Sequence, residues 1–132
     1  MRFTEHELTL ALTGAAKQVM AVQRKDVRKG KVDVDAAWEA TDRYRRFVLL
    51  DGLGAQLLPV LVALPDVEVA AGTRPTFTED QIAATVEQVV GEEGGRLRRK
   101  ATVAARVALV KVALEHLPPR QYPDALIVPD HL

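Results

Sequence analysis

The 132-residue chain contains no cysteine, no serine and no asparagine. The lack of cysteine excludes disulfides, thiolate nucleophiles and cysteine-based zinc sites. The lack of serine as well means that this chain alone forms neither a Ser-His-Asp nor a Cys-His catalytic centre. Without asparagine there is also no acceptor for N-glycosylation. Nucleophile and base chemistry is therefore left to threonine, lysine, tyrosine, histidine and the carboxylates.

The chain also lacks a net charge, because 18 basic residues balance 18 acidic ones. A domain that binds nucleic acid without sequence preference usually carries a basic excess, so any basic surface here must be local. Apolar residues make up 48% and charged residues 27%, which is the composition of an ordinary globular domain. We expect no cofactor and no metal from this composition.

Long apolar runs are missing too. The most apolar stretch, residues 47–64, is interrupted by Asp51, two glycines and Pro59, whereas a membrane span needs about 20 predominantly apolar residues. The N-terminus places charged residues where a signal peptide would be apolar. We therefore expect a cytoplasmic protein without a membrane segment, in which residues 47–64 form buried core.

Apolar residues at helical spacing predict an all-α fold, a small bundle of four long helices in a single domain over residues 1–132. The expected helices cover residues 5–29, 34–50, 79–90 and 96–117. Gly30 is placed to stop the first helix and Asp33 to cap the second. A proline-rich tail follows from about residue 118, and its apolar residues 126–128 suggest an arm docked on this chain or on a neighbouring subunit.

Two of these helices have predicted positions in the bundle. The last one contains "VAARVALVKVAL", which is apolar on nearly every side, so we expect it at the centre. The second helix should turn one line of side chains, its inner stripe, toward the core. The aromatic side chains on either side of this stripe should be at least partly buried. The stripe consists of Ala37, Thr41, Tyr44 and Val48, and the flanking residues are Trp38 and Phe47.

Residues 53–70 leave two interpretations open. One is a short buried helix over residues 53–64, bent at Pro59. The other is a pair of short strands, 60–64 and 67–70, that turn at Pro65 and Asp66. Periodicity does not separate the two for short apolar runs. The valines favour strands and the helical neighbours favour a helix, which is the interpretation we prefer.

The stretch "FTEHEL" at residues 3–8 has an echo in "FTEDQI" at residues 77–82. In both copies threonine at the N-cap and Glu or Gln three residues later form a capping box, and Phe with Leu or Ile forms a hydrophobic staple. Aspartate replaces His6 in the second copy, so the recurring feature is the helix start. We therefore predict that His6 is a surface residue and not a metal ligand.

A basic cluster is the feature that ordinary helix chemistry explains least. Arg96, Arg98, Arg99 and Lys100 occupy the first turns of the last helix, where cations oppose the helix dipole at a cost of a few tenths to ~1 kcal/mol each. One account is that Glu92 and Glu93, just upstream, neutralise part of this charge. The other is a contact with an anion, an acidic partner or the acids of another subunit. The arginine-rich stretch "TDRYRRF" does not predict such a contact. Acidic residues precede two of its arginines by four positions, and such i,i+4 pairs are typical of a solvent-exposed, salt-bridged helix face.

Signals for an enzyme are few. There is no Glu-x-x-His pair for a di-iron bundle and no phosphate loop, and "DGLGAQ" lacks the third glycine of a dinucleotide fingerprint. A small-ligand or enzymatic pocket would involve Trp38, Tyr44 or Asp51, the last being the only charge in the apolar run. The sequence favours a protein-interaction or homo-oligomerisation module. A nucleic-acid or polyanion-binding regulator is the second hypothesis, and a ligand pocket is the third.

Overall fold

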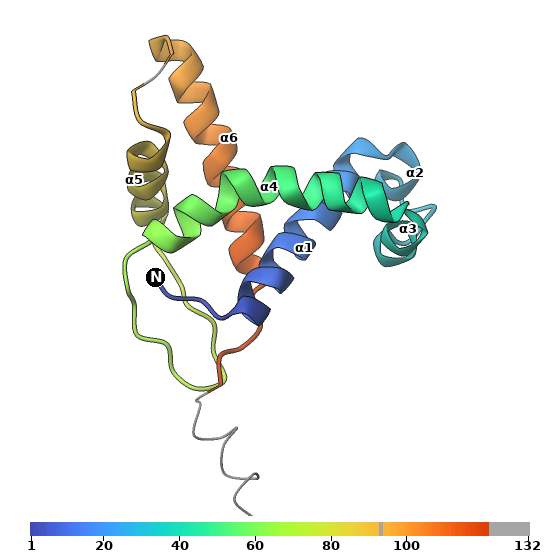
Figure 1. Cartoon of the computed structure of the whole chain (residues 1–132), viewed down its shortest axis with the longest axis horizontal. Helices are drawn as coiled ribbons and strands as arrows, with labels where there is room; N and C mark the ends of the chain where they lie inside the picture. The colour runs from blue at the N-terminus through green and yellow to red at the C-terminus, as the bar shows by residue number, and fades with distance from the viewer. Residues whose placement is uncertain (93, 122–132) are drawn as a thin grey trace, which may run out of the picture.

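The computed structural model describes residues 1–92 and 94–121, and within these ranges every regular element is a helix (Figure 1). The helices are α1 (Glu5–Gln23), α2 (Lys25–Arg28), α3 (Val34–Ala40), α4 (Arg43–Ala63), α5 (Glu79–Val90) and α6 (Arg96–Glu115). The predicted all-α bundle with four long helices is confirmed by α1, α4, α5 and α6. The expected arm at residues 126–128 lies outside the described residues.

Both copies of the repeated pattern start a helix as predicted. Thr4 Oγ1 accepts a hydrogen bond from the backbone N–H of Glu7 at 3.1 Å, and the Glu7 carboxylate accepts one from the N–H of Thr4 at 2.8 Å. Thr78 and Gln81 repeat the same reciprocal pair at 3.1 and 2.8 Å. The two capping boxes set the first residues of α1 and α5.

The first helix is shorter than expected, so the prediction of one helix over residues 5–29 is wrong. Arg24 leaves the helical conformation with φ −97° and ψ 117°, and its guanidinium pairs with Asp26 at 2.7 Å. The chain then turns Val27 into the core within the short α2. Gly30 does adopt positive φ, at 76°, but it follows α2 rather than α1.

The expected helix over residues 34–50 is also divided in two. Thr41 and Asp42 are extended, with ψ of 136° and 139°, and they separate α3 from α4. The Thr41 hydroxyl donates to the carbonyl of Ala37 at 2.7 Å, which satisfies one acceptor at the end of α3. The break lets the short α3 bury Trp38, whose exposed fraction is 5%.

After this break, α4 runs without interruption to Ala63, so the two-strand alternative for residues 60–64 and 67–70 is wrong. The preferred helix over residues 53–64 is confirmed as helical, but it is the second half of a longer helix. Pro59 lacks the N–H that would bond to the carbonyl of Ala55. Both residues are exposed, so the missing hydrogen bond lies on the side of α4 that faces solvent.

The core forms where α4 crosses α1 and α6, and it continues between α5 and α6, which lie side by side (Figure 1). We expected α6 at the centre, and it does contact α1, α4 and α5. Nevertheless, its Ala104, Ala105 and Ala108 are exposed, so α6 is not surrounded. The second half of α4 and the residue after it supply most of the largest fully buried side chains, which are Leu57, Val60, Leu61, Leu64, Val86 and Val110.

Gly14 permits the close approach of α1 to the end of α6. A methyl group at this position would overlap the Cβ and imidazole ring of His116. Rotation of the His116 side chain would not relieve this overlap, because the Cβ is attached directly to the backbone. The contact between these two helices therefore requires glycine at this position.

We predict that Gly14→Ala lowers the free energy of unfolding by about 1–3 kcal/mol, the usual cost of overpacking a tight contact. Gly52→Ala is the matched control, because Gly52 also lies within a helix but has no atom within 4 Å of an added methyl group. The control should gain about 0.5–1 kcal/mol from improved helix propensity. Urea unfolding measures both, and equal effects of the two substitutions would contradict the close contact.

Candidate functional site

The three side chains of the Glu-His-Glu stretch at the start of α1 do not converge on a common site, because neighbouring residues of a helix point in different directions. Glu5 and His6 are exposed, whereas Glu7 is 4% exposed. Across residues 1–92 and 94–121, no group of three or more histidine, aspartate or glutamate side chains is arranged to hold a metal ion. The placement of His6 at the surface agrees with the sequence prediction.

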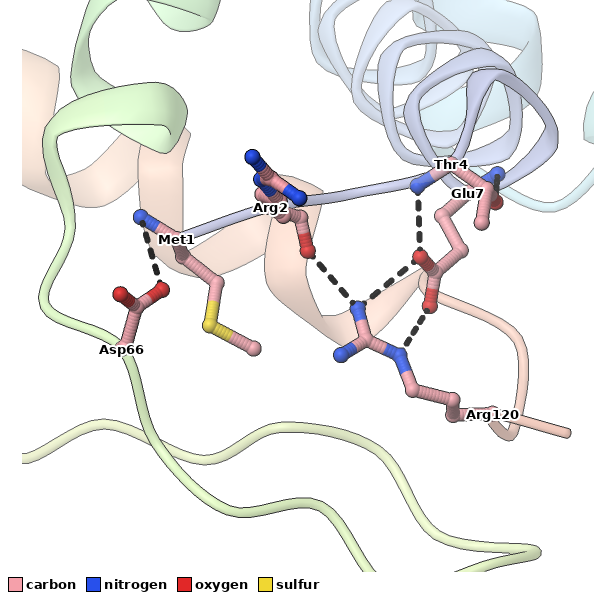
Figure 2. A network of polar contacts seen from close by, with 6 residues as sticks. All are labelled: Met1, Arg2, Thr4, Glu7, Asp66 and Arg120. Carbon is pink, nitrogen blue, oxygen red and sulfur yellow. Dashed lines mark hydrogen bonds and ion pairs between the residues drawn. The ribbon is translucent and has the colours of Figure 1, made fainter. Parts of the chain in front are cut away.

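Glu7 instead joins three distant segments through Arg120 (Figure 2). The Arg120 guanidinium donates to both carboxylate oxygens of Glu7, at 3.1 and 3.0 Å, and also to the carbonyl of Arg2 at 3.1 Å. The backbone N–H of Arg120 donates to the carbonyl of Thr73 at 2.7 Å, and its carbonyl accepts from the N–H of Gly72 at 2.8 Å. Arg120 is therefore structural: its side chain fastens the chain after α6 to the N-terminal segment, and its backbone fastens it to the loop before α5.

The charge of Glu7 is stabilised in the folded protein. Burial alone would raise the pKa of its carboxyl group, but the hydrogen bonds from Arg120 and from the N–H of Thr4 outweigh burial and hold the pKa below its ordinary value. No sequence pattern indicates this pair, since its members lie 113 positions apart. A capping-box glutamate also looks the same in sequence whether it is buried or exposed.

The predicted basic cluster at the start of α6 separates into two parts. Arg96, Arg98 and Lys100 are exposed, and none of them forms an ion pair with a described acidic residue. Arg99 turns back to α5, where its Nε donates to the carbonyl of Gly91 at 2.5 Å and its Nη2 to that of Glu87 at 3.4 Å. A cation is favourable at that helix end, so Arg99 has a structural role.

The start of α6 also exposes an apolar side chain among these cations. Leu97 is 83% exposed, and Gly95 precedes the helix without a side-chain cap. A separate hollow of about 450 Å³ near this helix start is lined by Arg98, Arg99 and Arg106 together with uncharged residues. This end of the molecule therefore presents several positive charges and one apolar side chain to solvent.

The suspected ligand pocket is an open groove at the other end of the molecule. It has a volume of about 940 Å³ and lies where α1, α3 and the start of α4 meet. Trp38 and Tyr44 line it, as the sequence suggested, but Asp51 does not. No described buried side-chain nitrogen or oxygen lacks a hydrogen-bond partner, so this groove offers no buried, unpaired polar group for catalysis.

The prediction that Tyr44 and Val48 turn toward the core is wrong, and Phe47, which we expected to be at least partly buried, is mostly exposed. They are 65%, 51% and 63% exposed, and Val62 at the far end of the same helix is 63% exposed. The opposite side of α4 occupies the core instead. We call the exposed side the outer face of α4; it consists of Tyr44, Phe47, Val48, Asp51, Ala55, Leu58, Pro59 and Val62.

By length and composition α4 is apolar enough to cross a membrane, and it is the one described helix of which this is true. Composition alone is weak evidence, since the core helix of a soluble protein meets the same criterion. Here one side of α4 packs in the core and Asp51 interrupts the other side. These features are compatible with a soluble protein.

Comparisons with protein-family models, with curated proteins and with solved structures found no match to this chain. Among the described residues, the outer face of α4 is the feature that the needs of the fold explain least.

We predict that acid weakens the fold through Glu7. Because the pKa of Glu7 is lower in the folded than in the unfolded chain, its contribution is complete above the unfolded pKa and is lost as pH falls through the folded pKa. Glu7→Gln keeps the capping box, as Gln81 does in α5, but loses the charge. It should cost about 1–3 kcal/mol at neutral pH and flatten the acid dependence of stability.

Glu5→Gln is the control for this prediction, because it removes the same charge from an exposed position in the same helical turn. It should leave the pH profile of chemical unfolding nearly unchanged. Identical profiles for Glu7→Gln and the unmodified protein would contradict the role assigned to the ion pair with Arg120.

Proposed function

We propose that this protein is a small cytoplasmic interaction module that associates with itself. The observation that carries the proposal is the outer face of α4. Four large apolar side chains of one helix, Tyr44, Phe47, Val48 and Val62, are each more than half exposed. An apolar patch of this kind on a folded domain marks an interaction site.

Covering this surface is favourable. Burial of apolar area contributes roughly 25 cal/mol per Å², and large aromatic side chains such as those of Tyr44 and Phe47 offer the most area. The helix presenting them is held rigidly, because Leu57, Val60 and Leu61 on its other side are fully buried. A rigid apolar surface loses little entropy when it binds, which supports the role of an interaction module.

We predict that the molar mass measured by light scattering exceeds that of one chain and rises with protein concentration. Phe47→Glu should shift the protein to the monomer, since it places a charge within the apolar surface. Val22→Glu is the control, because Val22 is also exposed, at 58%, but belongs to α1. A monomeric mass for the unmodified protein at the highest concentration would refute self-association.

A second function, binding of a polyanion such as nucleic acid, is favoured by the start of α6. Arg96, Arg98 and Lys100 project to solvent at a helix end where positive charge is unfavourable. A bound phosphate chain would supply the missing negative charge. Arg99 is excluded from this surface, because it is engaged with the end of α5.

We predict for this second function that fluorescence anisotropy with single-stranded DNA shows binding that weakens steeply with salt. The pair Arg98→Glu with Lys100→Glu should abolish it. The pair Lys29→Glu with Lys31→Glu changes net charge equally at exposed positions of another segment and should retain most binding. Equal losses in the two variants, or binding that is insensitive to salt, would refute a specific surface at α6.

A further inference from the structure

Residues on the outer face of α4 are spaced like those along which two helices pair in a coiled coil, and we call this line of residues the seam. Six positions, 44, 48, 51, 55, 58 and 62, follow one another at intervals of four, three, four, three and four. This is the a and d pattern of a coiled coil, which keeps one line of side chains on one side of a helix. Five of the six residues are exposed and Leu58 is partly buried, so the seam faces solvent along its length.

The seam is separate from the side of α4 that serves the core. The buried residues of α4 are Leu53, Gly54, Leu57, Val60 and Leu61. They lie between the seam positions in sequence and project from the opposite side of the helix. The described part of the chain therefore leaves the seam uncovered along about 27 Å, from the rise of 1.5 Å per residue between Tyr44 and Val62.

We propose that this seam pairs in antiparallel orientation with the same seam of a second copy, an inference that rests on the proposed self-association. The six positions are symmetric about residue 53, so an antiparallel pair matches every seam residue with another. Tyr44 faces Val62 of the partner subunit, and Val48 faces Leu58 of the partner subunit. Asp51 faces Ala55 of the partner subunit. A two-fold axis requires this kind of self-complementary surface.

Charge selects the antiparallel orientation over the parallel one. The arginines of α4, Arg43, Arg45 and Arg46, all lie in its first turn, and Asp51 is its only acidic residue. A parallel pair would place the arginines of both copies side by side and the two Asp51 carboxylates in the same layer. An antiparallel pair moves the two arginine groups to opposite ends, and it sets each Asp51 beside a methyl group, which leaves its carboxylate room to reach water.

The groove at the start of α4 extends the same surface. Tyr44 and Val48 belong both to the seam and to the wall of the groove, next to Met20 and Trp38. In the antiparallel pair, the end of α4 of the partner subunit lies over this groove. The second copy therefore covers both apolar features of this part of the molecule at once.

The absence of cysteine makes a direct test possible, because each introduced thiol is unique. Variants Tyr44→Cys and Val62→Cys alter two exposed positions, so both should fold. An equimolar mixture is treated with a short bismaleimide cross-linker. We expect covalent dimers between the two variants and none from either variant alone, since identical thiols are about 27 Å apart along the pair.

Val48→Cys mixed with Leu58→Cys repeats the test nearer the centre, where identical thiols are about 15 Å apart along the pair. Gln56→Cys is the control, because Gln56 is exposed on α4 but lies outside the seam. Alone or mixed with a seam variant, it should give no covalent dimer.

The outcomes separate this inference from the proposed function. Cross-linking of Tyr44→Cys or Val62→Cys with itself shows a parallel pair, and dimers by light scattering without any cross-link at the seam show another interface. Either result overturns the antiparallel seam and leaves self-association intact. A monomeric mass overturns both, including the case in which the monomer binds phospholipid vesicles through α4.

Discussion

The structure depends on one constraint: α4 has apolar side chains on two sides, and the other described residues, within 1–92 and 94–121, cover only one of them. Leu57, Val60 and Leu61 form the centre of the core, where α1, α5 and α6 meet α4. Tyr44 and Val48 face the other way. The inner side specifies the fold of the single chain, and the outer side is available for association. The proposed function follows from this division of one helix between two tasks.

A few specific contacts hold the helices and loops outside α4 together. Arg120 ties the segment after α6 to Glu7 and to the backbone of Thr73, so the helical bundle is closed at the end where α1 begins. Gly14 lets α1 and the end of α6 approach closely beside that closure. Arg99 closes the opposite end by capping α5. These contacts account for Glu7, Gly14, Arg99 and Arg120 without assigning them to a ligand.

The sequence was most informative about elements that start and stop by local chemistry. The capping boxes at Thr4 and Thr78 and the bounds of α5 were predictable, because a helix start is specified by a few neighbouring residues. The joint at Thr41 and the inward or outward orientation of Tyr44 were not, since both sides of α4 are apolar and periodicity does not identify which one meets the core. Arg99 was grouped with the other cations because its contact with α5 arises only from tertiary packing.

The most direct test of the claim that the outer side of α4 mediates association is to measure nuclear magnetic resonance chemical shifts over a dilution series. The account predicts that the resonances of Tyr44, Val48 and Val62 change with protein concentration, while those of the buried Leu57 and of Arg98 at the start of α6 change little. Concentration-dependent shifts at Arg98 with an unchanged outer face of α4 would contradict it.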